Sequence, residues 1–215
     1  MAQPYILDLD GTLMPSHAVD NECYWAAVAE TFDVAQDTVA LTNFTNVSDD
    51  GILNEWAERT LGRGVTPVEH ATMKQVFLRC IDDAARTNLA AFRPFPGVIE
   101  WLAARPAGSI AIATGGWSHT ARRKLSLASL SAFELPLASS DDDHRREMIM
   151  RHAHTLLAPE FRGTTPIYLG DGPWDFSASA DLGWGFIGIA EGERASRLQA
   201  LGAEEVHADF LPLLP

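Results

Sequence analysis

The sequence has little cysteine and little positive charge. Only two of its 215 residues are cysteines, Cys23 and Cys80, and each lies in a segment with a helical pattern. Disulfide frameworks and zinc sites need more cysteines at closer spacing, so we expect both thiols to pack in the core. Sixteen basic against 29 acidic residues give a net charge of −13. This balance excludes a general electrostatic attraction to nucleic acid or anionic membranes, so any phosphate site must be local.

Long apolar segments are absent as well. No apolar run approaches the roughly 20 residues that a membrane-spanning helix needs. The first residues, Met1-Ala2-Gln3-Pro4, lack the basic and apolar regions of a secretory signal. We therefore expect a cytoplasmic protein with neither a nucleic-acid nor a membrane partner. A hydrophobic fraction of 47% supports a sizeable core, but composition leaves the number of domains and the oligomeric state open.

The stretch with the most chemical information reads YILDLDGTL, from Tyr5 to Leu13. An apolar run typical of a buried strand ends at Asp8 and Asp10, and Gly11 then permits a sharp exit. Side chains two residues apart on a strand share a face, so both carboxylates would crowd one volume, as a hard cation requires. The alternative is a turn in which the two Asp residues cap backbone amides.

The string DLDGTL resembles the first motif of the haloacid dehalogenase (HAD) superfamily. In that family the first Asp is the nucleophile and the second is a general acid and base, which implies these roles for Asp8 and Asp10. Three further motifs follow in the family, and the sequence contains a candidate for each in the same order.

The candidate for the second motif is an apolar strand pattern that ends at Thr114, Gly115 and Gly116. Backbone amides beside glycines at a helix start can approach a phosphate closely, and the Thr114 hydroxyl adds a donor. The same three residues also suit an ordinary turn. The resemblance to the family implies that Thr114 and Gly115 bind phosphate and that Thr114 contributes to catalysis.

The candidate for the fourth motif, G-D-x-x-x-D, begins where an apolar strand pattern ends at Asp171, with Asp175 four residues later. In the family these acids bind magnesium directly or through water. The resemblance implies an Mg²⁺ site formed by Asp8, the backbone carbonyl of Asp10, and Asp171. Asp175 is either a further ligand or the cap of a helix that begins near Phe176.

The third motif supplies a Lys or Arg that steadies the nucleophile and the phosphoryl group. The candidates are Arg145 and Arg146 in the run DHRRE. This run resembles the D-x-H-S-R stretch of one branch of the family, which favours Arg146 as the functional cation. Arg145 is the alternative, and either side chain could instead be a solvated charge at a helix start.

The pattern of elements predicts an α/β fold with a helical insertion. Between the first two motifs we expect helices over 20–32 and 51–61, and a long helix that starts at the capping box Thr66-Pro67-Val68-Glu69. From Val98 onwards strands and helices alternate, which predicts a Rossmann-like parallel sheet with helices on both faces. The expected helices are 98–104, 118–128 and 145–157, and the expected strands are 109–113, 135–138, 166–169 and 185–189.

About 100 residues separate the first strand from the next, far more than a crossover between parallel strands needs. We therefore expect a HAD-like core formed by residues 1–15 and 93–215, with an all-helical cap domain at 16–92. The polar run from Thr45 to Gly51 lies where related caps carry a specificity loop, so Asn46 and Asp49 are candidates for substrate selection. Trp174 is a further candidate. An exposed turn with a helix cap at Ser48 or Asp50 is the alternative.

The resemblance implies a magnesium-dependent phosphatase, similar to phosphoglycolate phosphatases, that hydrolyses a small phosphate ester through an aspartyl phosphate. Asp10 separates this function from that of a dehalogenase or phosphonate hydrolase, because a leaving alkoxide needs a proton. A phosphomutase and a catalytically silent member of the family are the remaining alternatives.

Overall fold

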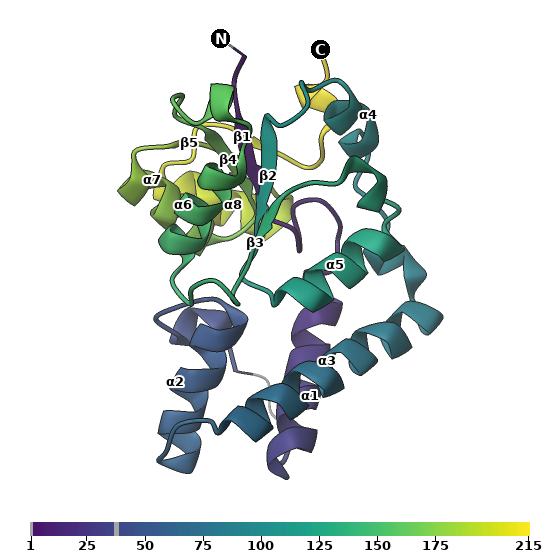
Figure 1. The fold of residues 1–215 in the computed structure, drawn as a ribbon, viewed down its shortest axis with the longest axis vertical. Coiled ribbons are helices and arrows are strands. Elements are labelled where there is room, and N and C mark those ends of the chain that lie inside the picture. Colours follow the sequence, from purple (N-terminus) through teal and green to yellow (C-terminus); the bar gives the residue numbers. More distant parts are fainter. Residues whose placement is uncertain (1, 37–38) are drawn as a thin grey trace.

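A computed structural model describes residues 2–36 and 39–215 of the chain, and predictions that fall on residues 1, 37 and 38 lie outside the described residues. The described residues form a six-stranded sheet in the order β3-β2-β1-β4-β5-β6, and every pairing is parallel (Figure 1). The strands are β1 (Tyr5–Leu7), β2 (Ile110–Ala113), β3 (Leu137–Ala138), β4 (Ile167–Gly170), β5 (Gly185–Ile189) and β6 (Val206–His207).

Alternate residues of the strands face opposite sides of the sheet, and both sides are buried. Ile6 pairs with Ala111 and faces one apolar cluster, whereas Leu7 pairs with Ile112 and faces another. Buried residues of α6 (Arg146–Leu156) and α7 (Pro173–Leu182) belong to the first cluster, and those of α4 (Val98–Ala103) and α5 (Ser118–Leu127) belong to the second. The predicted α/β sheet with helices on both faces is thus confirmed.

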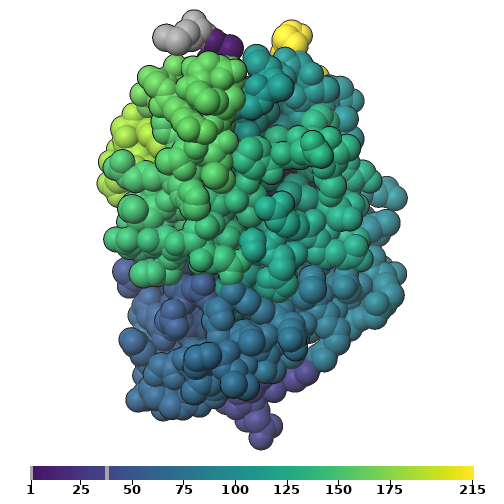
Figure 2. Space-filling view, viewed as in Figure 1, coloured from purple at the N-terminus to yellow at the C-terminus, as the bar shows by residue number. Residues whose placement is uncertain are grey.

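The segment between β1 and β2 is helical, as the sequence predicts. Its elements are α1 (His17–Phe32), η1 (Leu41–Asn43), α2 (Asp49–Leu61), α3 (Pro67–Thr87) and η2 (Leu89–Phe92), and no strand occurs among its described residues. We call residues 16–92 the helical insert. Helices α1 and α3 pack against each other, and the insert lies below the ends of the strands in Figure 1. In the space-filling view it forms the purple and blue end of the molecule (Figure 2).

Two helices of the insert, α2 and α3, begin at side-chain caps. Thr66 Oγ1 accepts a hydrogen bond from the Glu69 amide at 3.3 Å, and a Glu69 carboxylate oxygen accepts one from the Thr66 amide at 2.9 Å. This confirms the predicted capping box, and α3 then continues to Thr87. Ser48 caps α2 by accepting a hydrogen bond from the Gly51 amide at 3.2 Å. The Ser48 cap is therefore present in the loop where substrate selection is also predicted.

Some elements differ from the prediction. Helix α7 begins at Pro173, earlier than the expected start near Phe176, because proline suits the first turn of a helix. Helix α8 (Gly192–Leu201) and strand β6 were not predicted. The remaining short helices are η3 (Ser131–Phe133), η4 (Pro159–Phe161) and η5 (Leu211–Leu213).

Both cysteines are free thiols within helices of the insert. Cys23 on α1 is buried and Cys80 on α3 is half-buried, in agreement with the expected packing role. Among the helices that the structure describes, none has the length and apolar character needed to cross a membrane.

Candidate active site

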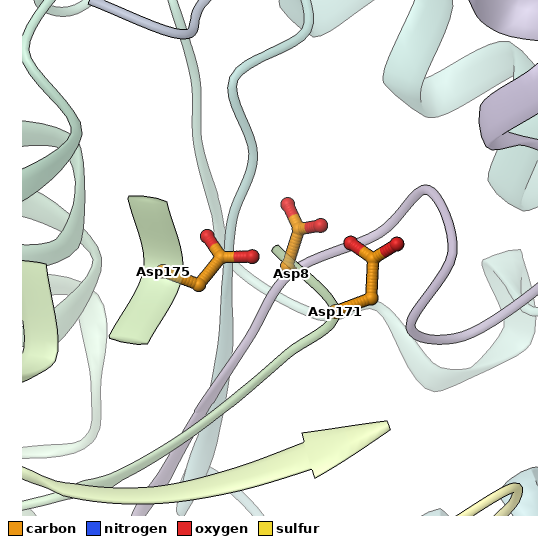
Figure 3. A group of neighbouring side chains, drawn as sticks. All are labelled: Asp8, Asp171 and Asp175. Carbon is orange, nitrogen blue, oxygen red and sulfur yellow. The ribbon is translucent and has the colours of Figure 1, made fainter. Parts of the chain in front are cut away.

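Three carboxylates meet beyond the ends of two neighbouring strands. Strands β1 and β4 are paired in parallel, so Asp8 and Asp171, which follow them, emerge side by side, and Asp175 reaches in from α7 (Figure 3). One oxygen from each carboxylate lies within 4.8 Å of the other two, and all three residues are buried. Gly11 has a φ of +84°, and a Cβ at this position would collide with the Asp171 carboxylate. The turn after β1 therefore requires glycine.

Arg146 brings a positive charge to this cluster. Its Nη1 donates to Asp8 Oδ1 at 3.2 Å, and its Nε lies 3.5 Å from Asp175 Oδ1. The side chain starts from the first turn of α6 and is buried. Arg145 points elsewhere, because it is exposed and its Nη2 pairs with Asp143 at 2.9 Å. Of the two candidates for the third motif, only Arg146 contacts the carboxylates.

The carboxylate cluster carries more negative charge than its basic contacts offset. Burial and the Asp175 charge raise the pKa of Asp8 well above its ordinary value, and Arg146 opposes this. Burial and Asp175 also raise the pKa of Asp171 to about 7, although Arg194 donates to Asp171 Oδ2 at 2.7 Å. Three carboxylates thus face two guanidinium groups among the described residues. Such a donor set fits a hard divalent cation with oxygen ligands.

The Asp175 carboxylate has three partners, one at Oδ2 and two at Oδ1. Its Oδ2 accepts a hydrogen bond from the Gly172 amide at 3.0 Å, while its Oδ1 faces Arg146 and lies 3.3 Å from the Tyr168 hydroxyl. The Asp175 side chain therefore caps α7 and also belongs to the carboxylate cluster.

Asp10 lies apart from the three carboxylates. Strand β1 ends at Leu7, so strand alternation does not continue through Asp10, but Asp8 and Asp10 line the same cavity and the Asp10 charge helps to raise the pKa of Asp8. Asp10 Oδ1 accepts a hydrogen bond from Ser16 Oγ at 2.5 Å, and Oδ2 accepts one from the ammonium group of Lys124. Asp10 is thus held by a hydroxyl and a cation at the edge of the same site.

The second motif joins the core to the helical insert. Thr114 directly follows β2 and is buried, and its Oγ1 accepts a hydrogen bond from the Gly116 amide at 3.1 Å. The Gly115 carbonyl accepts one from the Asp49 amide at 2.8 Å. A Cβ at Gly115 would lie 2.9 Å from the Val47 carbonyl oxygen and 3.0 Å from Arg146 Nη2. Only glycine fits at this junction.

A cavity of about 330 Å³ lies between the core and the insert. Asp8, Asp10, Thr114, Arg146 and Asp171 all line it from the core side. Two of the three candidates for substrate selection, Asp49 and Trp174, line it as well. Asn46 does not, because it packs beside Gly51 at the start of α2.

Four charged residues at the site are absent from the sequence-based prediction: Asp20, Lys124, Arg194 and Arg197. Lys124 on α5 is fully buried and donates to Asp20 at 2.7 Å as well as to Asp10. Arg194 lies on α8, an element that was not predicted. One signal could have revealed Lys124, since it falls on the same helical face as Ala121 and Leu125, where a lysine needs a buried partner.

Solved structures share this fold. A hydrolase from Pseudomonas syringae superposes with a TM-score of 0.73 at 21% identity, over 99% of this chain and 96% of that chain. CbbY from Rhodobacter sphaeroides in complex with phosphate gives 0.70 at 17% identity, and a haloacid dehalogenase-like family protein from Streptococcus pneumoniae gives 0.63 at 18%. Both of these comparisons also cover 99% of this chain and 96% of the other. No protein-family model and no curated protein matches the sequence. The fold of this chain is therefore that of the haloacid dehalogenase-like hydrolases.

Proposed function

We propose that this protein is a magnesium-dependent phosphatase that hydrolyses a small phosphate ester through an aspartyl phosphate on Asp8. The observation that carries the proposal is the contact of Arg146 with Asp8 beside the carboxylates of Asp171 and Asp175, at the wall of a cavity. A protein of the same fold, CbbY, has been solved in complex with phosphate. This supports phosphate as a ligand of this fold.

In the first step a carboxylate oxygen of Asp8 attacks phosphorus, and the bond between phosphorus and the ester oxygen breaks. The departing alkoxide takes the proton carried by Asp10 and leaves as an alcohol. Ser16 and Lys124 fix the orientation of the Asp10 carboxyl group, since each donates to one of its oxygens.

In the second step Asp10, now a carboxylate, takes a proton from a water molecule whose oxygen attacks the same phosphorus. The bond between phosphorus and Asp8 breaks, which releases inorganic phosphate and restores the Asp8 carboxylate. Asp10 is left protonated for the next substrate, so protons and charges balance over the cycle.

The phosphoryl oxygens need positive charge and donors throughout. Arg146, the Thr114 hydroxyl and the Gly115 amide would bind these oxygens from three sides. Asp8, Asp171 and Asp175 would hold Mg²⁺, with the backbone carbonyl of Asp10 as a further ligand. The bound ion would supply charge neutralisation between the Asp8 carboxylate and the phosphoryl group. The helical insert would act as the cap over this site.

A metal-dependent assay with p-nitrophenyl phosphate tests the proposal. We expect turnover that disappears with EDTA and returns with added Mg²⁺, and a loss of roughly a thousandfold or more in Asp8→Asn. Asp181→Asn, an exposed substitution on α7, is the matched control and should retain wild-type turnover. Turnover in Asp8→Asn close to that of the control would contradict the covalent mechanism.

A further inference from the structure

Apolar atoms form most of the surface of the cavity, and the helical insert supplies six of its apolar residues. The core residues of the proposed function account for the phosphoryl group, so the rest of the ester must lie against the insert. The insert also supplies seven polar or titratable residues to the cavity, of which two are acids and one is a histidine: His17, Asp20, Asn21, Tyr24, Thr42, Ser48 and Asp49. The apolar residues that the insert supplies to this wall are Ala18, Val39, Ala40, Leu41, Val47 and Ile52.

Among the residues of the insert that the structure describes, no lysine or arginine lines the cavity. The insert contains five such residues, and each is paired with an acidic residue elsewhere. The five pairs are Arg59 with Glu55, Arg63 with Glu69, Lys74 with Asp141, Arg79 with Glu30, and Arg86 with Asp83. An anionic group on the substrate would therefore find no lysine or arginine on this wall. His17 lines it as well, but burial and the neighbouring Arg194 charge lower the pKa of its ring, which favours the neutral form.

The cations that reach the cavity from the core also have acidic partners. Arg146 pairs with Asp8, which belongs to the proposed chemistry. Arg194 pairs with Asp171 at 2.7 Å, and Arg197 pairs with Glu193 on the surface of α8. Neither of the latter two lies on the insert.

Two acids lie on the insert wall, and neither would attract a second anion. Asp20 is already paired with Lys124, and Asp49 accepts a hydrogen bond from the Trp117 amide at 2.8 Å. Burial, followed by the Asp20 charge, raises the pKa of Asp49 well above its ordinary value, so this part of the cavity already disfavours negative charge. An unpaired carboxylate or phosphate buried here would lose its hydration without compensation.

We infer that the leaving group of the substrate is an uncharged alcohol whose body is largely apolar where it meets the insert. This inference rests on the proposed phosphatase function and narrows its substrate class. It excludes phosphate esters that carry a carboxylate, such as phosphoglycolate, and bisphosphates. The apolar residues contact the body of the alcohol, and Asn21 or Thr42 can bond to an additional hydroxyl group.

Phosphate esters of similar size and different charge test this inference. We expect kcat/KM for isobutyl phosphate and for glycolamide phosphate to exceed that for phosphoglycolate roughly tenfold or more, because only phosphoglycolate places a charge against the wall. Propyl phosphate should likewise exceed phosphoethanolamine, whose ammonium group must leave water. A value for phosphoglycolate or phosphoethanolamine that equals or exceeds that of its neutral counterpart would overturn the inference.

Hydrolysis of p-nitrophenyl phosphate shows whether the inference on the leaving group is wrong or whether the protein is not a phosphatase at all. If that ester is hydrolysed and phosphoglycolate is preferred among the alkyl esters, only the inference on the leaving group is wrong. If no ester is hydrolysed in the presence of Mg²⁺, the phosphatase function is wrong, and the inference falls with it.

A substitution on the wall gives a second test. Leu41 is half-buried and lines the cavity, so Leu41→Lys introduces a cation where the wall has none. We expect the ratio of kcat/KM for phosphoglycolate to that for isobutyl phosphate to rise roughly tenfold in Leu41→Lys and to change less than about twofold in Leu41→Met. Circular dichroism and thermal unfolding establish that both variants are folded. An unchanged ratio in a folded Leu41→Lys variant would show that the leaving group does not meet this wall.

Discussion

The ammonium group of Lys124 donates to the carboxylate of Asp10 in the interior of the protein. The same nitrogen donates to Asp20 Oδ1 at 2.7 Å, and Asp20 lies on α1 of the insert. One fully buried cation on the core therefore holds both the proposed acid and base and the first helix of the insert. Charge pairing, in addition to apolar packing, fixes how these two parts meet.

We expect Lys124→Met to lower the free energy of unfolding by about 3 kcal/mol, because it leaves Asp10 and Asp20 close together without a cation. Urea unfolding followed by circular dichroism measures this loss. The double variant Lys124→Met with Asp20→Asn should recover part of it, since one of the two charges is then removed. Arg123→Met, which breaks an exposed pair with Asp82, should change the stability by less than about 1 kcal/mol. Equal losses of unfolding free energy in Lys124→Met and Arg123→Met would show that the buried pairs of Lys124 with Asp10 and Asp20 do not stabilise the fold.

The two adjacent arginines should differ in their effect on turnover. Arg146→Ala removes a buried contact to Asp8, and we expect kcat/KM for p-nitrophenyl phosphate to fall roughly a hundredfold or more. Arg145→Ala removes an exposed pair with Asp143 and should leave kcat/KM within about twofold. Steady-state kinetics measure kcat/KM for both variants. A larger loss in Arg145→Ala than in Arg146→Ala would make Arg145 the functional cation.

The capping box of α3 should contribute measurably to stability. Thr66→Ala removes the acceptor for the Glu69 amide, so we expect the free energy of unfolding to fall by about 1 kcal/mol. Thr87→Ala, at the exposed carboxyl end of the same helix, is the matched control and should cost less than half as much. If both variants lose the same free energy of unfolding, the Thr66 cap does not stabilise α3 more than an exposed threonine elsewhere on the helix.

Cys23 should resist alkylation. Burial raises the pKa of its thiol to about 12, so the reactive thiolate is scarce between pH 7 and pH 9. We expect iodoacetamide to modify Cys23 on the order of a thousandfold more slowly in the native protein than in urea at pH 8. The native rate should stay low up to pH 9, because the thiolate forms only as the pH approaches 12. Mass spectrometry of digests measures both cysteines, and rapid native labelling of Cys23 would contradict its burial.

Much of the fold could be predicted because local signals agree with the final structure. The Thr66 capping box marks the start of α3, and the apolar runs before Asp8, Thr114 and Asp171 mark three neighbouring strands. Strand β6 has only two paired residues, Val206 and His207, which is too short for an alternating pattern to be read. Helix α8 precedes it without a clear cap and was missed with it.

In the candidate site, too, residues marked by a local sequence pattern could be predicted, and residues whose contacts are distant in the sequence could not. Residues that follow apolar strands could be placed together, because parallel strands end at the same edge of a sheet. The partners of Lys124 could not be predicted, since Asp10 and Asp20 are more than 100 residues away in the sequence. A cap at Ser48 could be predicted, but no sequence pattern specifies that Asn46, just before this cap, packs beside Gly51 and does not line the cavity.

The strand order has a consequence for the synthesis of the chain. Strand β1 lies in the middle of the sheet, between β2 and β4, and Tyr5 pairs with Ile110 and Ile167. The first strand to leave the ribosome therefore has no partner until more than half of the chain has followed. The helices of the insert depend on nearer contacts, such as that between α1 and α3, and can assemble during this interval. The nascent protein thus exposes an apolar strand for most of its translation, which makes β1 the segment that a chaperone would shield first.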